Sequence, residues 1–414
     1  MIRILPPGDA SKLLRRKAAR LDEAEQTVRP MLEAVRVRGD RALLEFARRF
    51  DGLERKSVRV PSPELATAAK TVSRDFRSAV QAASRNIRAF AKLQLPVAKS
   101  AQIAPGLRVG QVVRPLETVA CYIPSGRYPL PSTLLMTAIP AQVAGVPNIC
   151  VASPRAVPEI YACASMLGLT QVFQMGGAHA IAAFAFGTKT VPRADRIVGP
   201  GNIYVAAAKK LVAGDVGFFY DAGTTEILII AADGNPAWIA ADMLAQAEHD
   251  TDASAILLTT SRPLADAVQQ ELEQQLATLP TAATARVAIR KNSAILLVDS
   301  LEQACELANR FAPEHLSLHD KSLLPRIHNA GGIFLGPLSP EAAGDYAAGP
   351  NHVLPTSGAA RLRAGLSSAD FVKVIATQDI SRAALTRLTP AITTLARAEG
   401  LEAHARSVEF RSSR

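Results

Sequence analysis

Apolar residues follow two patterns along this 414-residue chain. Residues 20–97 carry apolar positions at helical spacing, with abundant Ala and with charged residues between them, which predicts a helical N-terminal region. From about residue 106, short apolar runs alternate with amphipathic segments, and these runs lie at 119–123, 148–152, 171–175, 195–199, 226–231, 254–259, 293–298 and 331–336. Runs that are nearly continuous in apolar residues are typical of parallel strands covered by helices on both faces. The pattern therefore predicts an α/β fold.

Glycines follow several of the predicted strands, as in Ser125-Gly126, Gly176-Gly177 and Gly199-Pro200-Gly201. A helical pattern comes after each of them, so backbone N–H groups and helix N-termini would lie at the C-terminal edge of a sheet, where phosphate-bearing ligands usually bind. The dinucleotide fingerprint G-x-G-x-x-G is absent, because Tyr204 stands at the third glycine position. Such glycines also serve plain tight turns, and the loops alone leave cofactor binding open.

The C-terminal tail from about residue 366 differs from the rest of the chain. Thr389-Pro390 indicates the start of a helix, with Thr389 as N-cap and Pro390 in the first turn. Arg397 lies in the expected last turn, and Gly400 can end the helix. A short closing helix of this kind is a candidate docking or dimer-forming arm.

Composition narrows the class of protein. The chain is 48% hydrophobic and 20% charged, as is ordinary for a soluble globular protein, and 414 residues exceed what one hydrophobic core usually supports. No apolar run approaches the roughly 20 residues of a membrane helix. The N-terminus lacks the apolar core and small-residue cleavage site of a secretory signal, so we expect no membrane partner and a cytoplasmic location.

The net charge of +10 could indicate nucleic acid or an anionic dinucleotide as the partner. The Lys and Arg residues are spread out, with short clusters at 15–17 and 361–363, and no nucleic-acid-binding motif is present, so we expect no nucleic-acid partner. The cysteines are scattered without a C-x-x-C pair, which argues against disulfides or a thiolate zinc site and favours small buried side chains. They are Cys121, Cys150, Cys163 and Cys305.

A helix is predicted to begin at Asn235-Pro236, and it carries Asp242, Gln246 and His249 at spacings of four and three, on one face. A polar stripe of this kind is often no more than a solvated face. Gln and His three residues apart can also present a carbonyl oxygen and an imidazole nitrogen to one metal ion, a combination that suits Zn²⁺.

Adjacent titratable groups follow a predicted helix end near Arg310. Pro313 breaks that helix and places Glu314 and His315 at a fixed turn. Such a pair can perform general acid–base chemistry, although adjacent Glu and His residues also occur on ordinary surfaces.

The Gly- and Pro-rich loop after residue 343 contains Asp345, a plausible oxygen ligand, and His352, a ligand or substrate contact. Loops held by a rigid scaffold are where such side chains usually work. His404 lies alone in a polar tail segment and is unremarkable by itself.

Taken together, these stretches resemble the histidinol dehydrogenase family from about residue 20 to residue 410. The matching motifs occur in the right order and are long, which makes the resemblance specific. They are CYIPSGRYPLPSTLLMTAIPAQVAGV, GGAHAIAAFAFGT, IVGPGNIYVAAAKKLVAGDVG, DMLAQAEHDTDASAILLT, APEHLSL, SPEAAGDYAAGPNHVLPTSGAA and EGLEAHARSV.

The resemblance implies a zinc-dependent, NAD-linked oxidation of L-histidinol, through its aldehyde, to L-histidine, the last steps of histidine biosynthesis. One Zn²⁺ per subunit would be bound, and Glu314 and His315 would be catalytic. The implied zinc ligands are Gln246, His249, Asp345 and His404. The implied substrate contacts are Thr225, Gln246, His249, His315, Asp345, His352, Glu399 and His404, and the implied NAD contacts are Tyr122, His179 and Asn202.

The resemblance also implies two Rossmann-like parallel-sheet domains and a homodimer with shared active sites, in which Glu399 and His404 act across the interface. We expect an N-terminal arm (1–20), a discontinuous α/β domain with most metal and catalytic residues (21–118 and 226–365), a second Rossmann-like domain on the NAD side (119–225), and a C-terminal dimerisation tail (366–414).

Three residues depart from the family pattern. Ser125 stands where glycine is usual, His179 where glutamine is usual, and Thr225 where serine is usual. Thr225 keeps the hydroxyl, so that contact can survive, whereas Ser125 and His179 both lie in the expected cofactor half. None of the three is an expected zinc ligand or a member of the Glu-His pair.

Three other functions remain open on the residues. The first is a zinc- and NAD-dependent dehydrogenase of another small polar alcohol, such as a polyol or a sulfonated diol, on the same scaffold. The second is a zinc hydrolase in which Glu314 activates water without a cofactor. The third is a basic nucleic-acid-binding protein.

Overall fold

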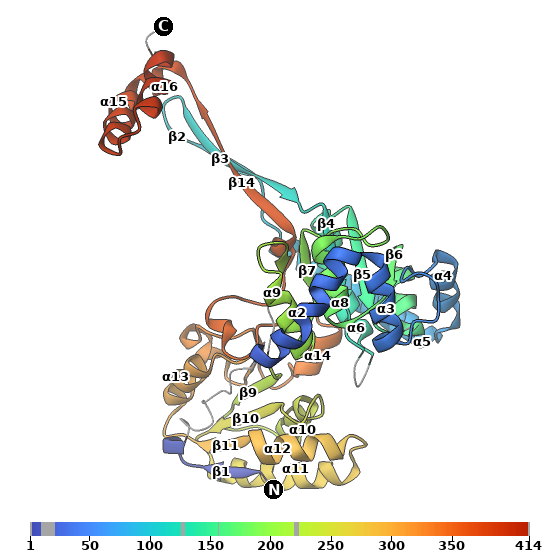
Figure 1. Cartoon of the computed structure of the whole chain (residues 1–414). Coiled ribbons are helices and arrows are strands. Elements are labelled where there is room, and N and C mark those ends of the chain that lie inside the picture. The colour runs from blue at the N-terminus through green and yellow to red at the C-terminus, as the bar shows by residue number, and fades with distance from the viewer. Residues whose placement is uncertain (1, 10–20, 126–128, 156, 219–222, 413–414) are drawn as a thin grey trace.

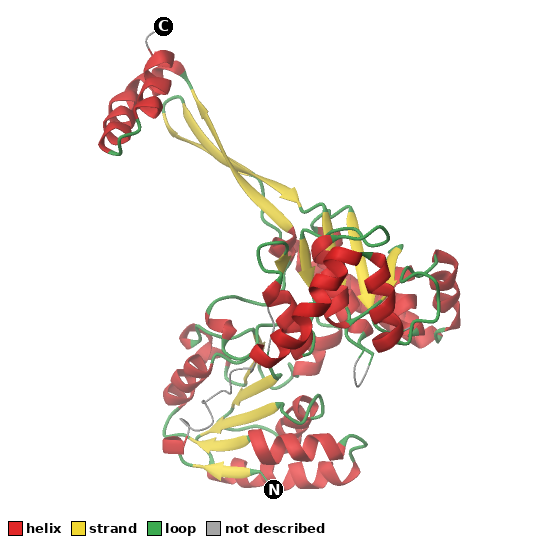
Figure 2. Cartoon of the chain, in the orientation of Figure 1, coloured by secondary structure: helices red, strands yellow, loops and turns green. Residues whose placement is uncertain are grey.

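The computed structural model describes residues 2–9, 21–125, 129–155, 157–218 and 223–412 of the chain. Part of the expected N-terminal arm, residues 10–20, lies outside them, as do Gly126 of the first glycine loop and residues 219–222. Two parallel sheets with helices on both faces form the body, and a long antiparallel arm extends from it (Figures 1 and 2).

The first sheet has six strands in the order β1-β11-β10-β9-β12-β13, and every neighbouring pair is parallel. The strands are β1 (Arg3–Leu5), β9 (Glu226–Ile230), β10 (Ser254–Thr259), β11 (Ala294–Leu297), β12 (His315–Leu318) and β13 (Gly332–Leu335). One face packs against α10 (Pro236–Ala247), α11 (Arg262–Thr278) and α12 (Ala282–Asn292), and the other packs against α13 (Leu301–Phe311) and the 3-10 helix η2 (Lys321–Arg326).

The second sheet has five parallel strands in the order β6-β5-β4-β7-β8. They are β4 (Thr118–Tyr122), β5 (Asn148–Ser153), β6 (Gln171–Gln174), β7 (Arg196–Val198) and β8 (Gly217–Phe218). Its covering helices are α2 (Leu21–Arg38), α3 (Asp40–Asp51), α8 (Gly177–Phe186) and α9 (Ile203–Leu211) on one face, and α4 (Ser62–Thr71), α5 (Arg74–Gln94), α6 (Pro131–Val143) and α7 (Pro158–Met166) on the other.

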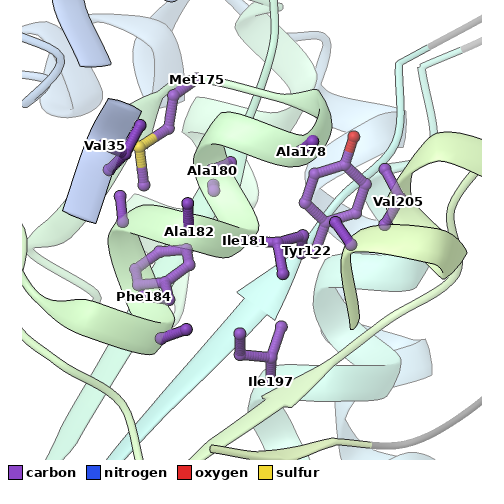
Figure 3. Close-up of a cluster of buried hydrophobic side chains, with 14 of the residues drawn as sticks. Val35, Tyr122, Met175, Ala178, Ala180, Ile181, Ala182, Phe184, Ile197 and Val205 are labelled. Carbon is purple, nitrogen blue, oxygen red and sulfur yellow. The ribbon is translucent and has the colours of Figure 1, made fainter. Parts of the chain in front are cut away.

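Alternation along β4 produces these two faces, because successive side chains of a strand point to opposite sides. Ala120 and Tyr122 lie in the core with α8 and α9, whereas Val119 and Cys121 lie in the core on the other face. Figure 3 shows the first of these cores, with Tyr122 directed toward the start of α8 near Ala178.

The helices of residues 21–94 pack on the second sheet, not on the first. The expected domain division put residues 21–118 in the same domain as residues 226–365. The hydrophobic cores instead join the helices of residues 21–94 to the five-stranded sheet. The reason is that the apolar faces of α2 and α5 contact α9 and α6, respectively. The expected domain boundaries themselves stay a prediction.

The arm consists of β2 (Lys99–Ala104), β3 (Leu107–Pro115) and β14 (Val372–Ile380), paired antiparallel in the order β14-β3-β2. Two helices, α15 (Arg382–Ala398) and α16 (Glu402–Ser412), lie at its far end (Figure 1). Most residues of β2 and β14 are exposed on both faces, including Ile103, Val374 and Ile375. The arm therefore presents apolar surface that the described residues do not cover.

The structure corrects the expected start of the tail helix. Pro390 lies inside α15, which begins eight residues earlier at Arg382, with the side chain of Ser381 as N-cap. Thr389 is not an N-cap, because its hydroxyl donates to the carbonyl of Leu385 within the helix. The expected end is confirmed, since the helix stops at Ala398 and Gly400 has a φ of 77°.

The expectation for the cysteines is confirmed, since all four are buried and free. Burial raises the pKa of Cys121, Cys150 and Cys163 to about 12, so these thiols are poor nucleophiles at neutral pH. In the part of the chain that the structure describes, no helix is long and apolar enough to cross a membrane. The remaining elements are α14 (Glu341–Tyr346) and the 3-10 helices η1 (Pro7–Asp9), η3 (Ala359–Arg361) and η4 (Ser368–Phe371).

Gly199 offers a test of how tightly β4 and β7 are joined. It has a φ of 105°, and a Cβ there would overlap the carbonyl oxygen of Tyr122. We expect Gly199→Ala to lower the free energy of unfolding by more than about 3 kcal/mol in denaturant titrations. Gly214→Ala is the matched control, because Gly214 has a φ of 103° but open space around its Cβ position, and we expect it to cost about 1 kcal/mol. Equal losses would show that the contact with Tyr122 is unimportant.

Candidate active site

Glu314 and His315 lie at the N-terminal end of β12, in the interior of the six-stranded sheet. Helix α13 ends at Phe311, Ala312 has a φ of 50°, and His315 is already the first residue of the strand. The sequence predicted a turn here but not the strand. Both side chains are buried, at 6% and 3% exposure. Buried titratable groups of this kind are not an ordinary surface pair, and they are candidates for proton transfer.

The carboxylate of Glu314 accepts two hydrogen bonds from the start of β9. Oε2 lies 2.6 Å from Oγ1 of Thr225 and 3.0 Å from the backbone nitrogen of Glu226. Burial raises the pKa of Glu314, and this effect exceeds the opposing effects of His315 and of the two hydrogen bonds. A carboxyl with a raised pKa can exchange protons nearer neutral pH than an exposed one.

Three carboxylates surround His315. Nδ1 lies 3.6 Å from Glu314 and 3.5 Å from Glu341, and Nε2 lies 3.8 Å from Asp345. Burial lowers the pKa of the imidazole, but the negative charges of Glu341, Glu314 and Asp345 outweigh burial and raise it to about 10. In the absence of any other cation, His315 is therefore protonated at neutral pH.

His249, Glu341 and Asp345 form a group that could hold a metal ion, since one ligand atom from each lies within 4.8 Å of the others. Glu341 and Asp345 are four residues apart in α14, which places both carboxylates on one face of the helix. His249 follows α10 just after the C-cap residue Glu248, so it lies beyond the helix and not on its face as predicted. Among these residues, the sequence missed Glu341.

The surroundings of the Gln246 amide differ according to whether a cation is present. Its side chain is fully buried, with one amide atom 2.6 Å from Thr225 Oγ1 and the other 2.7 and 3.1 Å from the two carboxylate oxygens of Glu341. Without a cation, the NH₂ of the amide is satisfied when it points toward Glu341 and donates to it, and the amide oxygen then competes with Glu314 for the single hydroxyl proton of Thr225. In the other orientation, the amide oxygen of Gln246 faces the carboxylate oxygens of Glu341. This arrangement is favourable only when a cation lies between these oxygens.

The donor set fits Zn²⁺. An imidazole nitrogen, carboxylate oxygens and an amide oxygen are within the range of ligands that zinc accepts. A divalent cation among His249, Glu341 and Asp345 would also offset the carboxylate charge around His315 and lower the pKa of its imidazole. The same ion would thus allow His315 to be neutral at neutral pH.

His352 connects this group to the second sheet's helices. Its Nδ1 donates to the carbonyl of Asp345 at 2.8 Å, and its Nε2 lies 3.2 Å from the hydroxyl of Thr133 in the first turn of α6. Burial lowers the pKa of His352, in keeping with a neutral ring that donates at one nitrogen and accepts at the other. Because both nitrogens have partners, a direct substrate contact would have to displace Thr133.

Glu399 and His404 lie at the far end of the arm, where both are exposed. Figure 1 shows α15 and α16 well away from α10 and α14. The described chain therefore does not bring either residue to Gln246, His249 and Asp345 within one subunit.

The three expected cofactor contacts gather at the C-terminal edge of the five-stranded sheet. Tyr122 ends β4, His179 lies in the first turn of α8 after β6, and Asn202 is the N-cap of α9 after β7. The hydroxyl of Tyr122 accepts from the backbone nitrogen of Gly177 at 3.1 Å, and burial raises its pKa to about 12. Asn202 already caps α9, because its side chain accepts from the nitrogens of Tyr204 and Val205.

Comparisons with known proteins point to one family. A family model described as histidinol dehydrogenase matches residues 14–412. This chain is 48% identical to histidinol dehydrogenase of Syntrophotalea carbinolica, over 94% of this chain and 92% of that protein, and 44% identical to that of Bacillus anthracis, over 97% and 95%. The crystal structure of histidinol dehydrogenase from Elizabethkingia anophelis has a TM-score of 0.93 at 36% identity, covering 99% of this chain and 98% of that one.

The chain belongs to the histidinol dehydrogenase family. This family is one of NAD-dependent oxidoreductases of histidine biosynthesis, and the chain shares the α/β fold of the solved relative. Of the residues that depart from the family pattern, Thr225 keeps a hydroxyl that contacts Glu314. Ser125 is buried, with a hydroxyl that has no hydrogen-bond partner among the described residues.

One feature of the sequence could have identified Glu341 as a neighbour of Asp345. It stands four residues before Asp345, just after a Ser-Pro helix start, so a helix over 341–346 would place both acids together. The six-residue helix is too short to show a clear hydrophobic period, and the loop expected there concealed the spacing. In this member of the histidinol dehydrogenase family, Glu341 is nearly fully buried, and burial raises its pKa to about 8.

We predict that Glu341→Gln weakens zinc binding by about tenfold or more, because it removes one negative charge from the donor group. Competition with a chromophoric chelator measures the affinity. Glu306→Gln is the control, since Glu306 is an exposed acid of α13 with no role in this group, and it should bind zinc like the wild type. Unchanged affinity in Glu341→Gln would exclude Glu341 from the metal environment.

Proposed function

We propose that this protein catalyses the four-electron, NAD-linked oxidation of L-histidinol to L-histidine through L-histidinaldehyde, in the cytoplasm. The observation that carries the proposal is the buried pair of Glu314 and His315 beside the group of His249, Glu341 and Asp345. An alcohol-to-acid oxidation requires a base for the alcohol and a base for the water that hydrates the aldehyde. Two titratable groups in different environments, next to a cation site, meet that requirement.

One Zn²⁺ per subunit would be held by Gln246, His249, Asp345 and, from a second copy of the chain, His404. Glu341 lies in the same donor group. When bound, zinc supplies a fixed point for the imidazole and amine of the substrate, so that its main contribution is positioning. The remaining substrate contacts that we propose are Thr225, His352 and, across the interface, Glu399.

His315 would take the hydroxyl proton of the alcohol. Its Nδ1 lies 3.2 Å from the carbonyl oxygen of Glu226, which accepts a hydrogen bond and places the proton on Nδ1. Its Nε2 is buried, with the carboxylate of Asp345 3.8 Å away and no atom at hydrogen-bond distance among the described residues, so Nε2 is the nitrogen that would receive the proton of a substrate hydroxyl. This arrangement fixes the tautomer that a general base at Nε2 needs.

Glu314 would activate the water that hydrates the aldehyde, so that the second oxidation yields the acid. Thr225 and the backbone of Glu226 hold the carboxylate in place, and its raised pKa suits a group that accepts and returns a proton within one turnover. Burial of the pair keeps bulk water from the aldehyde.

NAD would bind at the C-terminal edge of the five-stranded sheet, which we take as a Rossmann-like unit, with Tyr122, His179 and Asn202 as contacts. It supplies the hydride acceptor in both oxidations. The fit is supported by Nδ1 of His179, which is buried without a hydrogen-bond partner in the described ranges. Ligands of α/β sheets usually bind at this edge.

We further propose that the arm, including the tail of residues 366–414, forms a homodimer. Its strands expose Ile103, Val374 and Ile375, and its helices expose Leu395 and Phe410. Exposed apolar surface on an isolated three-stranded sheet favours contact with a second chain. An arm of this reach can carry Glu399 and His404 to the site of the other subunit.

The first test measures NADH formed per L-histidinol. Two NADH are expected from the wild type. Glu314→Gln should slow the aldehyde-to-acid half by about 100-fold, but the alcohol-to-aldehyde half much less, because only hydration needs this carboxylate. His315→Asn should slow both halves, since the ring serves the hydroxyl proton of each. Stopped-flow kinetics with L-histidinol and with the aldehyde separate the halves, and equal effects of Glu314→Gln on both would contradict the assignment.

Subunit mixing tests the shared site. In the complete oxidation of L-histidinol to L-histidine, Glu314→Gln and His404→Ala homodimers should both be nearly inactive. In a mixed dimer, one site receives both defects and the other neither. Random reassociation in equal amounts should then restore roughly a quarter of wild-type activity. Mixing Glu314→Gln with His315→Asn subunits is the control, because both defects lie on the same side of the site and no intact site can form. If His404→Ala mixtures recover no more than that control, the shared site is disproved.

A further inference from the structure

A buried hydrogen bond joins α3 to the start of α8. Oδ2 of Asp51, the last residue of α3, lies 2.7 Å from Nε2 of His179, and the side chains are 5% and 1% exposed. The same oxygen accepts from the backbone nitrogen of Gly176 at 2.9 Å. Asp51 therefore holds both the imidazole and the N-cap residue of α8.

The two nitrogens of His179 have different surroundings. Nε2 faces the carboxylate, whereas Nδ1 is buried and has no hydrogen-bond partner within the described parts of the chain. A buried polar atom without a partner costs about 1–3 kcal/mol, so its persistence calls for an explanation.

Nδ1 lies just beneath Gly177. A Cβ built on Gly177 would be 3.5 Å from Nδ1, and Gly177 itself is partly exposed. Because Gly177 has no side chain, only its backbone lies over the Nδ1 edge of the ring. The hydroxyl of Tyr122 accepts from the nitrogen of the same Gly177.

Two aromatic rings lie beside the imidazole. The rings of Phe46 and Phe50, both in α3, have their centroids 6.0 and 6.2 Å from that of His179. Helix α3 thus contributes a carboxylate and two rings to one side chain of α8, although it precedes the five-stranded sheet in the chain.

We propose that Asp51 is a positioning residue for the cofactor. Its carboxylate accepts a hydrogen bond from Nε2 of His179 and so presents Nδ1 of the ring to a hydrogen-bond donor of the dinucleotide. This inference rests on the proposed function, in which NAD binds at this edge. The donor is a hydroxyl or amide N–H group, because a bare imidazole nitrogen accepts and cannot donate. Asp51 itself does not contact the cofactor.

The tautomer can be tested without any cofactor. In ¹⁵N-histidine-labelled apo-protein, with the His179 signals assigned by their loss in His179→Gln, the wild type should show a proton on Nε2 and a bare Nδ1. Asp51→Asn should retain this state, because an amide oxygen in place of Oδ2 still accepts from Nε2 and from Gly176. Asp51→Ala should lose this preference for a proton on Nε2, because the variant has no acceptor for Nε2. A wild-type proton on Nδ1, or the same tautomer in Asp51→Ala, overturns the inference.

NAD affinity tests the consequence. By calorimetry, Asp51→Ala should bind NAD about tenfold more weakly, which corresponds to about 1.4 kcal/mol, and Asp51→Asn within about twofold of the wild type. The KM for NAD should rise in Asp51→Ala while the KM for L-histidinol stays unchanged. In a His179→Gln background, Asp51→Ala should have little further effect, since Asp51 acts through that ring.

Asp40→Ala is the matched control. Asp40 begins the same helix and accepts a hydrogen bond from the hydroxyl of Thr190 at 2.6 Å. Asp40→Ala therefore also removes an acid of α3 and a hydrogen bond, but without touching His179. An equal loss of NAD affinity in Asp40→Ala and Asp51→Ala, or additive effects of Asp51→Ala and His179→Gln, would mean that Asp51 acts only through stability, and this overturns the inference. If the wild type binds no NAD but shows the expected tautomers, the proposed function fails instead.

Discussion

The structure depends on how negative charge is buried around His315. Three carboxylates, those of Glu314, Glu341 and Asp345, lie within 3.8 Å of one imidazole. Two unit charges 4 Å apart interact by about 4 kcal/mol at an effective dielectric constant of about 20, so a single imidazolium would not balance the three acids if each were ionised. Burial raises the pKa values of Glu314 and Glu341, and the negative charge of Asp345 raises them further. A divalent cation offsets this negative charge and so returns His315 to the neutral form that a base requires.

The fold links this cluster to the five-stranded sheet by opposite sheet ends. Glu226 and His315 begin their strands, so the cluster lies at the N-terminal edge of the six-stranded sheet, whereas Tyr122 ends its strand in the other sheet. The loop after α14 connects the two. His352 contacts Thr133, and the side chain of Asn351 donates to the carbonyl of Met136, both in α6. Hydrogen bonds to α6 thus hold the loop beside Asp345 against a helix of the second sheet.

Much of this fold could be predicted from the pattern of apolar residues, because buried parallel strands leave a strong signal. The run at 254–259 coincides with β10, and seven other runs fall on strands within one or two residues. Strands β2, β3 and β14 escaped prediction because they lie in the exposed arm, where no core selects apolar residues. Burial of Glu314 and His315 was also invisible, since the neighbours that bury them, Thr225 and Glu341, are distant in sequence.

The role of His404 could not be predicted from the residues of a single chain. Its exposure and its place in α16 are what an ordinary surface histidine would have, and only the arm gives it another meaning. A three-stranded sheet with apolar residues on open faces gains little stability alone, so contact with a second chain would contribute to its folding as well as to its position. Were the active site completed in this way, metal binding and subunit association would be thermodynamically linked, because a ligand from the partner binds only when the arm is seated. Contact of the exposed sheet with a second chain and metal binding would then stabilise each other.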